Sequence, residues 1–149
     1  MKNTKATIKM VITLFALSAI FLSNKVHAQQ VSAEVTNLRS SKGTIVFSVF
    51  NDEQSYDKLK PHKKFVFDKK RVADGRISFN LGLPPGNYGI TILDDENDNG
   101  KMDNNFIGMP KEGFGFSNFF MEKLKKPNFE DFKISVKSAD KITFKIKYL

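Results

Sequence analysis

The acidic stretch from Asp95 to Asp103, DENDNGKMD, holds the residues best suited to chemistry. Oxygen-bearing side chains stand at alternate positions and Gly100 follows at the sixth, which is the opening pattern of a Ca²⁺ loop. Oxygens so spaced can converge on one hard cation, while the glycine permits a sharp turn and the next carbonyl joins the shell. The predicted ligands are Asp95, Asn97, Asn99, the Lys101 carbonyl and Asp103.

This loop departs from an EF-hand at its twelfth position, where Phe106 replaces the bidentate glutamate. A further ligand has to come from Asp94, Asn105 or Glu112. Because two alternating positions are asparagine, we expect weak affinity, with a Kd of roughly 10⁻⁴ to 10⁻³ M as in extracellular modules. The alternative is a solvated turn that binds no ion, since Asn, Asp and Gly favour turns by themselves.

An aromatic and glycine-rich segment follows, from Phe106 to Asn118. Its glycines permit unusual backbone angles. Phe106, Phe114 and Phe116 fit two interpretations: they plug the end of the core, or they rim a ligand groove for a glycan or peptide. Both remain open on the sequence alone.

Catalysis has little support. The only histidine after residue 28 is His62, which lies in a basic run, and no nucleophile elbow, zinc-binding helix or phosphate loop is present. The absence of cysteine excludes disulfides and thiol chemistry. We expect a non-enzymatic protein. The competing hypothesis is a hydrolase of envelope glycans that acts through the carboxylate of Asp95 or Glu112.

The first 28 residues have the layout of a signal peptide. Lys2, Lys5 and Lys9 precede an uncharged, mainly apolar run over 10–22, and Ala28 supplies the small residue at the cleavage position. The run is too short for a membrane span, which needs about 20 residues. We therefore expect cleavage near Ala28, one domain over 29–149 with no membrane span, and a periplasmic, secreted or cell-surface location.

The net charge also changes with this cleavage. Four lysines and no acidic residue leave with the signal peptide, so the formal net charge falls from +8 to +4. Nucleic-acid binding needs a concentrated basic patch, which a mild excess does not indicate. We expect a monomer whose partner is an envelope protein or glycan rather than nucleic acid.

After the signal peptide, apolar and polar residues alternate with period 2 in about seven segments, which is typical of half-buried strands. Their centres are near residues 33, 47, 66, 79, 90, 134 and 145. Short turns and no long helix predict an all-β, antiparallel, Ig-like β-sandwich. Helical turns are expected only in 52–59 and 118–125, and 138–140 is expected to close a hairpin between the last two strands.

Two further features concern the connections. Leu83-Pro84-Pro85-Gly86 predicts a type II turn, with Gly86 at positive φ. The region 94–127 is one long loop between strands, and long ordered loops in compact domains tend to be functional.

The turn Leu83-Pro84-Pro85-Gly86-x-Tyr88, with the stretch from Asp95 to Asn118, resembles the DUF2141 family of small exported bacterial proteins, which has no assigned function. The resemblance covers the predicted mature chain and implies a transthyretin-like (prealbumin-like) sandwich. The acidic loop is also similar to Ca²⁺ loops of B-type repeats in bacterial surface adhesins, although Asn104 and Asn105 replace their downstream acid. We expect an exported binding or accessory module with a structural Ca²⁺ loop; a structural partner domain of an outer-membrane complex is a further alternative.

Overall fold

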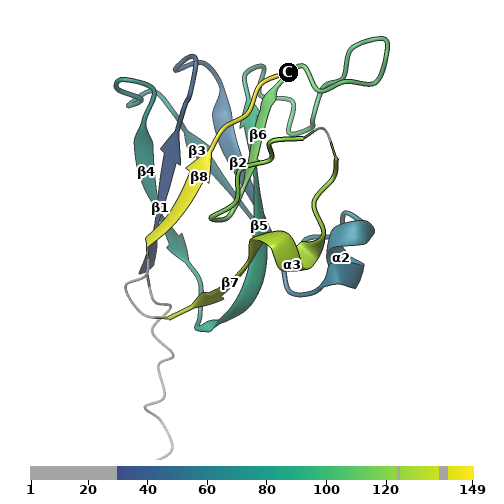
Figure 1. The fold of residues 1–149 in the computed structure, drawn as a ribbon. Helices are drawn as coiled ribbons and strands as arrows, with labels where there is room; N and C mark the ends of the chain where they lie inside the picture. Colours follow the sequence, from purple (N-terminus) through teal and green to yellow (C-terminus); the bar gives the residue numbers. More distant parts are fainter. Residues whose placement is uncertain (1–29, 124, 138–140) are drawn as a thin grey trace, which may run out of the picture.

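The computed structural model describes residues 30–123, 125–137 and 141–149 (Figure 1). The predicted signal peptide, 1–28, and the predicted turn at 138–140 lie outside these residues. Within the described residues no helix has the length and apolar character to cross a membrane.

Eight strands of the described residues form two packed sheets, which confirms the all-β sandwich. The additional strand, β6, lies inside the region 94–127, so the prediction of one uninterrupted loop there is wrong. The first sheet has the order β4-β1-β8, and the second has the order β3-β2-β5-β6 with β7 also paired to β5. The strands are β1 Gln30–Thr36, β2 Thr44–Phe50, β3 Lys63–Asp68, β4 Ile77–Gly82, β5 Gly86–Asp95, β6 Gly113–Phe116, β7 Lys133–Val136 and β8 Lys141–Lys145.

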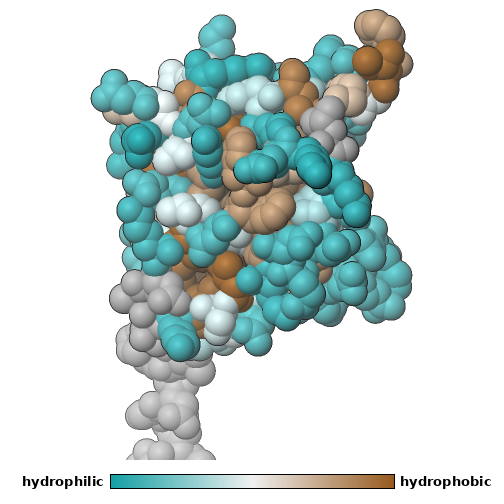
Figure 2. All heavy atoms as spheres, in the orientation of Figure 1, coloured by the Kyte–Doolittle hydropathy of each residue, from teal (hydrophilic) through white to brown (hydrophobic). Residues whose placement is uncertain are grey.

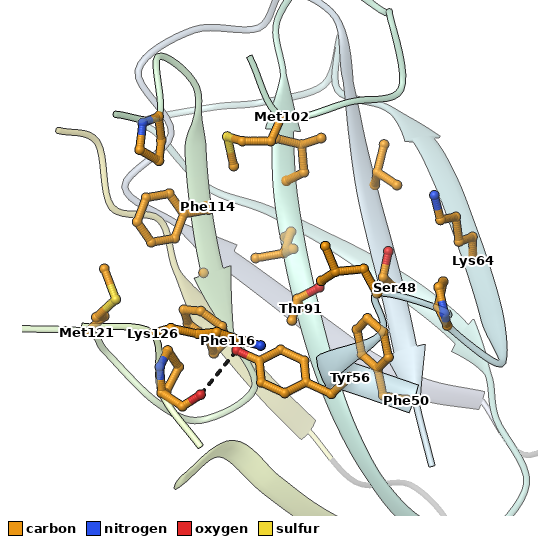
Figure 3. Close-up of a pocket in the computed structure, with 18 of the residues that line it drawn as sticks. Ser48, Phe50, Tyr56, Lys64, Thr91, Met102, Phe114, Phe116, Met121 and Lys126 are labelled. Atoms are coloured by element: carbon orange, nitrogen blue, oxygen red, sulfur yellow. Dashed lines mark hydrogen bonds between the residues drawn. The ribbon is translucent and has the colours of Figure 1, made fainter. Parts of the chain in front are cut away.

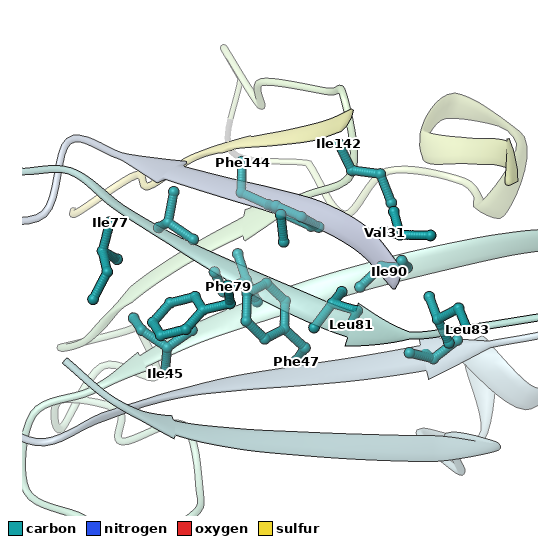
Figure 4. Close-up of a cluster of buried hydrophobic side chains, with 14 of the residues drawn as sticks. Val31, Ile45, Phe47, Ile77, Phe79, Leu81, Leu83, Ile90, Ile142 and Phe144 are labelled. Atoms are coloured by element: carbon teal, nitrogen blue, oxygen red, sulfur yellow. The ribbon is translucent and has the colours of Figure 1, made fainter. Parts of the chain in front are cut away.

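The main core lies between the two sheets (Figure 4). Successive side chains on a strand point to opposite faces, so the alternating residues noted in the sequence meet on the inner faces. Phe47 of β2 is fully buried and packs edge to face on Phe79 and Phe144 of the opposite sheet, with ring centroids 5.8 and 5.2 Å apart. This arrangement suits aromatic quadrupoles and joins the two sheets.

The predicted hairpin between the last two strands is wrong. β7 pairs with β5 in the second sheet, whereas β8 pairs with β1 in the first, and the β1–β8 pair is parallel. Alternation fixes which side chains face inward on a strand but carries no information about which strand lies beside it. The antiparallel expectation holds for every other strand pair that the structure describes.

Two short helices in the described part of the chain lie beside the second sheet. The first, α2 Glu53–Asp57, falls where the sequence predicts it, and the Asp52 side chain caps it by accepting the Ser55 N–H at 2.7 Å. The second is not in 118–125, where the described residues hold no helix, but at α3 Phe129–Phe132. The reason is packing: both of its phenylalanines are buried against Gly89, where a Cβ would lie 2.6 Å from either ring.

The turn before β5 also differs from the prediction. Gly86 is the first residue of β5 and is not among the described glycines with positive φ, so a type II turn with a left-handed Gly86 is wrong. The Tyr88 hydroxyl donates a hydrogen bond to the Pro84 carbonyl at 3.1 Å and holds the turn instead.

Candidate functional site

The outer face of the second sheet carries a second hydrophobic cluster. The segments before and after β6, together with α2 and α3, cover this face. The cluster comprises the buried residues Phe50, Tyr56, Phe114, Phe116, Met121, Phe129 and Phe132, with Met102 and Phe119 half-buried beside them. Strands β2, β5 and β6 therefore bury side chains on both faces, and an open groove remains between the covering segments (Figure 3).

Two rows of side chains across the strands form the groove floor. Strand register aligns residues of β3, β2, β5 and β6, and residues opposite each other across a pair lie side by side. One row of the floor is entirely apolar: Val46, Leu93 and Phe114. Val66 continues this row on β3 but lines the neighbouring hollow instead. The row beside it is largely polar: Lys64, Ser48, Thr91 and Phe116.

The groove walls come from three separate segments. The β5–β6 connection supplies Met102, Met109 and Pro110; α2 and the residues after it supply Tyr56, Leu59 and Pro61; and the segment before α3 supplies Met121, Lys126 and Pro127. The cavity is about 520 Å³. Every methionine beyond residue 28 lines it. Because methionine is flexible and polarisable, such a lining adapts to apolar ligands of varied shape.

The polar side chains of the groove are hydroxyls and amines. The lining includes no carboxylate or imidazole side chain; its hydroxyls belong to Ser48, Thr91 and Tyr56. The Tyr56 hydroxyl donates to the Pro127 carbonyl at 3.2 Å, and burial, with smaller contributions from nearby acids, raises its pKa to about 12. The phenol therefore stays protonated near pH 7.

Two lysines line the groove and differ in their partners. Lys126 Nζ lies 2.9 Å from Asp57 and 4.3 Å from the centroid of the Tyr56 ring. Lys64, on the β3 side in Figure 3, makes no ion pair with any of the described residues. A neighbouring hollow of about 370 Å³ shares Lys64 and extends to Asp95 and Asp98 of the acidic loop.

The acidic loop is folded by bonds from its own side chains to its backbone. The two Asp95 carboxylate oxygens accept the N–H groups of Asn99 and Gly100 at 3.1 and 2.7 Å. The Asn97 and Asn99 oxygens each accept the N–H two residues on, at 3.1 and 2.8 Å. Gly100, at φ +72°, allows the sharp turn. The predicted ligands at 95, 97 and 99 thus all bend one loop.

Asp103 closes the same loop. Its carboxylate accepts hydrogen bonds from the side-chain amides of Asn97 at 2.6 Å and Asn99 at 3.1 Å, so its oxygens already have partners within the loop. To bind a cation here, both asparagines have to turn their oxygens toward it in place of their N–H groups. The described residues include no group of three or more His, Cys, Asp or Glu side chains that could hold a metal ion. Ca²⁺ binding therefore stays a prediction.

Asp94, a candidate further ligand, is directed away from the loop. Neighbouring residues on a strand face opposite ways, so Asp94 shares the inner face of β5 with Ile92 while Asp95 faces out. Its carboxylate pairs with the buried Lys69 and accepts the Tyr148 hydroxyl. Burial and this hydrogen bond raise the pKa of Tyr148. Nothing in the sequence singled out Lys69, which stands in an ordinary basic run.

Glu112, another candidate ligand, clasps the two ends of the acidic loop. One carboxylate oxygen accepts the Glu96 N–H and the other accepts the Asp103 N–H, both at 3.1 Å. The side chain is buried, and desolvation raises its pKa against the opposing effect of these two hydrogen bonds. Because both oxygens are occupied, Glu112 sets the shape of the loop.

A family model described as "Uncharacterized protein conserved in bacteria (DUF2141)" matches residues 33–143. The chain belongs to the DUF2141 family. The match runs from β1 into β8 and includes both sheets, the acidic loop and the groove floor. No curated protein and no solved structure matches this chain.

The three aromatic candidates of the DUF2141 chain do not act as one group. Phe114 and Phe116, each 9% exposed, lie in the groove, whereas Phe106 is fully exposed. Phe106 and Ile107, 69% exposed, form a hydrophobic tip on the β5–β6 connection. A loop projects at the upper right of Figure 1, and hydrophobic side chains lie at the same place in Figure 2. Asn105, the third candidate further ligand, shapes this tip by accepting the Ile107 and Met109 N–H groups. The burial of Phe114 and Phe116 counts against their stacking on a sugar.

One feature of the sequence of this DUF2141 chain, apolar residues on both faces of β2, points to the covered outer face of the second sheet. Val46 and Phe50 are apolar on the face of β2 opposite to Ile45, Phe47 and Val49. A strand that is apolar on both faces is covered on both. That pattern indicates that something packs outside the second sheet, although it does not indicate that a groove remains open.

Proposed function

We propose that this DUF2141 protein is an exported, non-enzymatic binding module of the bacterial envelope, and that its ligand is a molecule with an apolar chain held in the groove. The observation that carries the proposal is the cavity of about 520 Å³ over β2, β5 and β6, lined mainly by apolar side chains with a few hydroxyls and amines. Small-molecule sites are typically clefts of about 300–1,000 Å³ with this composition.

The enzyme alternative lacks support of this kind. The carboxylates of Asp95 and Glu112 each accept two backbone N–H groups, and the groove lining contributes no acid or base of its own. A glycosidase needs two carboxyl groups that flank an open cleft. Binding therefore agrees better with the geometry than hydrolysis does.

Fluorescence of the neutral apolar probe N-phenyl-1-naphthylamine tests the groove. We expect saturable enhancement with the mature protein. Ser48→Phe places a ring on the groove floor. It should weaken the apparent affinity at least about tenfold, because the ring occupies space that the ligand needs. The matched control is Ser78→Phe, the same change on the exposed face of β4 in the other sheet. Equal binding by wild type and Ser48→Phe would contradict the proposal.

We further propose that the acidic loop binds Ca²⁺ and that the ion has a structural role. The residues that suit this are Asp95, Asn97, Asn99, the Lys101 carbonyl and Asp103. The fit rests on the first three, whose side-chain oxygens already bend the loop by accepting its N–H groups. The ion would supply charge to hold these oxygens together. Since Gly100, Met102 and Met109 also line the groove, the ion would stabilise one groove wall.

Thermal unfolding tests this claim. With a Kd of about 10⁻⁴ to 10⁻³ M, 10 mM Ca²⁺ adds about 1.4–2.7 kcal/mol to the free energy of unfolding, so Tm should rise by several degrees over an EDTA sample. Asp103→Asn should abolish the difference because it removes a ligand charge. The control Asp98→Asn makes the same change inside the loop at a position outside the alternating set, and its Ca²⁺ response should persist. No shift in the wild-type protein would exclude a structural ion.

A further inference from the structure

The arrangement of charge in the groove says more about the ligand than its apolar character does. The following inference rests on the proposed binding function of the same groove. Lys64 ends the polar row of the floor, with Ser48 and then Thr91 beside it across the strands. The apolar row of Val46, Leu93 and Phe114 runs alongside. The floor thus has a polar row and an apolar row directly beside each other.

The charged side chains of the lining have one sign. Lys64 and Lys126 line the groove and no acidic side chain does. Lys126 already pairs with Asp57, so its charge is partly compensated, whereas Lys64 has no ion pair among the described residues. An anionic ligand group at Lys64 gains a charge-assisted hydrogen bond, while a cationic one is repelled. The acids of the neighbouring hollow, Asp95 and Asp98, do not line the groove. Asp95 lies opposite Thr44, on the far side of the apolar row from Lys64.

Other occupants fit the groove less well. An extended peptide that adds to a sheet needs free backbone groups, but β2 and β5 each pair on both sides, so the floor offers side chains only. A sugar needs an exposed ring face, and Phe114 and Phe116 are buried. What remains is a flexible hydrocarbon chain, which the three methionines can accommodate.

We propose that the groove binds a single-chain fatty acid, with its carboxylate at Lys64 and its chain over Val46, Leu93 and Phe114 under the methionines of the wall. The carboxylate sets the orientation of the ligand, and the chain provides most of the affinity. Each buried methylene contributes a similar amount to one partly exposed ion pair, and the chain has many methylenes.

Displacement of N-phenyl-1-naphthylamine by dodecanoate and by dodecanol, both below their aggregation limits at pH 8, tests this proposal. The wild type should prefer the acid. In Lys64→Gln, dodecanoate affinity should fall about twofold to fivefold, as for loss of one partly exposed ion pair, while dodecanol affinity should not change. The control Lys42→Gln removes the same charge from an exposed position outside the groove lining and should behave as wild type.

The outcomes separate the two proposals. If the acid and the alcohol displace the probe equally and Lys64→Gln changes neither, the fatty-acid assignment is overturned while apolar binding in the groove stands. If neither the probe nor dodecanoate binds, both proposals fail. A second copy of the chain is the other occupant to exclude: a dimer in sedimentation velocity that Ser48→Phe dissociates would show that the groove is a dimer interface and would overturn the fatty-acid site.

Discussion

Lys69 and Asp94 form an ion pair that is completely shielded from water. Both side chains are buried at one end of the core, and the Tyr148 hydroxyl donates to the second oxygen of Asp94. A third contact ties this group to the surface, because the Arg39 N–H donates to the Tyr148 hydroxyl at 3.1 Å. Such a pair adds little net stability over apolar residues of equal size, yet loss of one partner leaves a buried charge without compensation.

Lys69→Met should therefore lower the free energy of unfolding by about 3–5 kcal/mol. The double variant Lys69→Met with Asp94→Leu should recover most of this loss, because no buried charge remains. Urea denaturation of the two variants measures the difference. Lys70→Met is the matched control: its ion pair with Asp68 is exposed, so its effect should stay below about 1 kcal/mol. A double variant as unstable as the single one would show that the pair itself, rather than the orphaned carboxylate, is what the fold requires.

At the scale of elements, the connection between β5 and β6 is held by one carboxylate. Glu112 stands directly before β6 and accepts backbone N–H groups from both ends of the acidic loop. Arg39 adds a second tie, since its guanidinium donates to both oxygens of Glu96. An isolated motif of asparagines and aspartates favours a turn, but these two contacts from elsewhere in the chain fix where the turn lies.

Glu112→Gln should lower the free energy of unfolding by about 1–3 kcal/mol, because an amide offers one acceptor to two backbone donors. The loss should depend on pH. Burial raises the pKa of Glu112 in the folded state, so its protonated form is favoured by folding. Its contribution is complete below the ordinary glutamate pKa of about 4.3 and falls as the pH rises through the raised pKa.

The gap in stability between wild type and Glu112→Gln should thus be larger at pH 4 than at pH 7, as measured by urea denaturation. Glu122→Gln, a change at an exposed glutamate, serves as the control and should give a pH-independent gap close to zero. A gap that widens from pH 4 to pH 7 would instead indicate that the ionised carboxylate is the form that stabilises the loop.

At the scale of the whole molecule, the sandwich follows from alternation, but its pairing does not. The inner-face residues of β1 and β4 could be predicted because each of these strands buries one clear alternating set. Lys69 could not be, since its meaning depends on Asp94, 25 residues away, across a contact that no local pattern encodes. The groove was missed for a related reason: it forms between α2, the β5–β6 connection and the segment before α3, so no single stretch contains it.

The position of β1 in its sheet has a consequence for the order of folding. β1 is the central strand, between β4 and β8, and its parallel partnership joins Val35 to Phe144. Pairings so distant in sequence carry a large loop-closure entropy and form late. A chain that emerges from a translocation channel with its N-terminal end first cannot complete this sheet until β8 has also emerged. For a protein that we propose to be exported, the topology thus delays the native state until β8 has been transported.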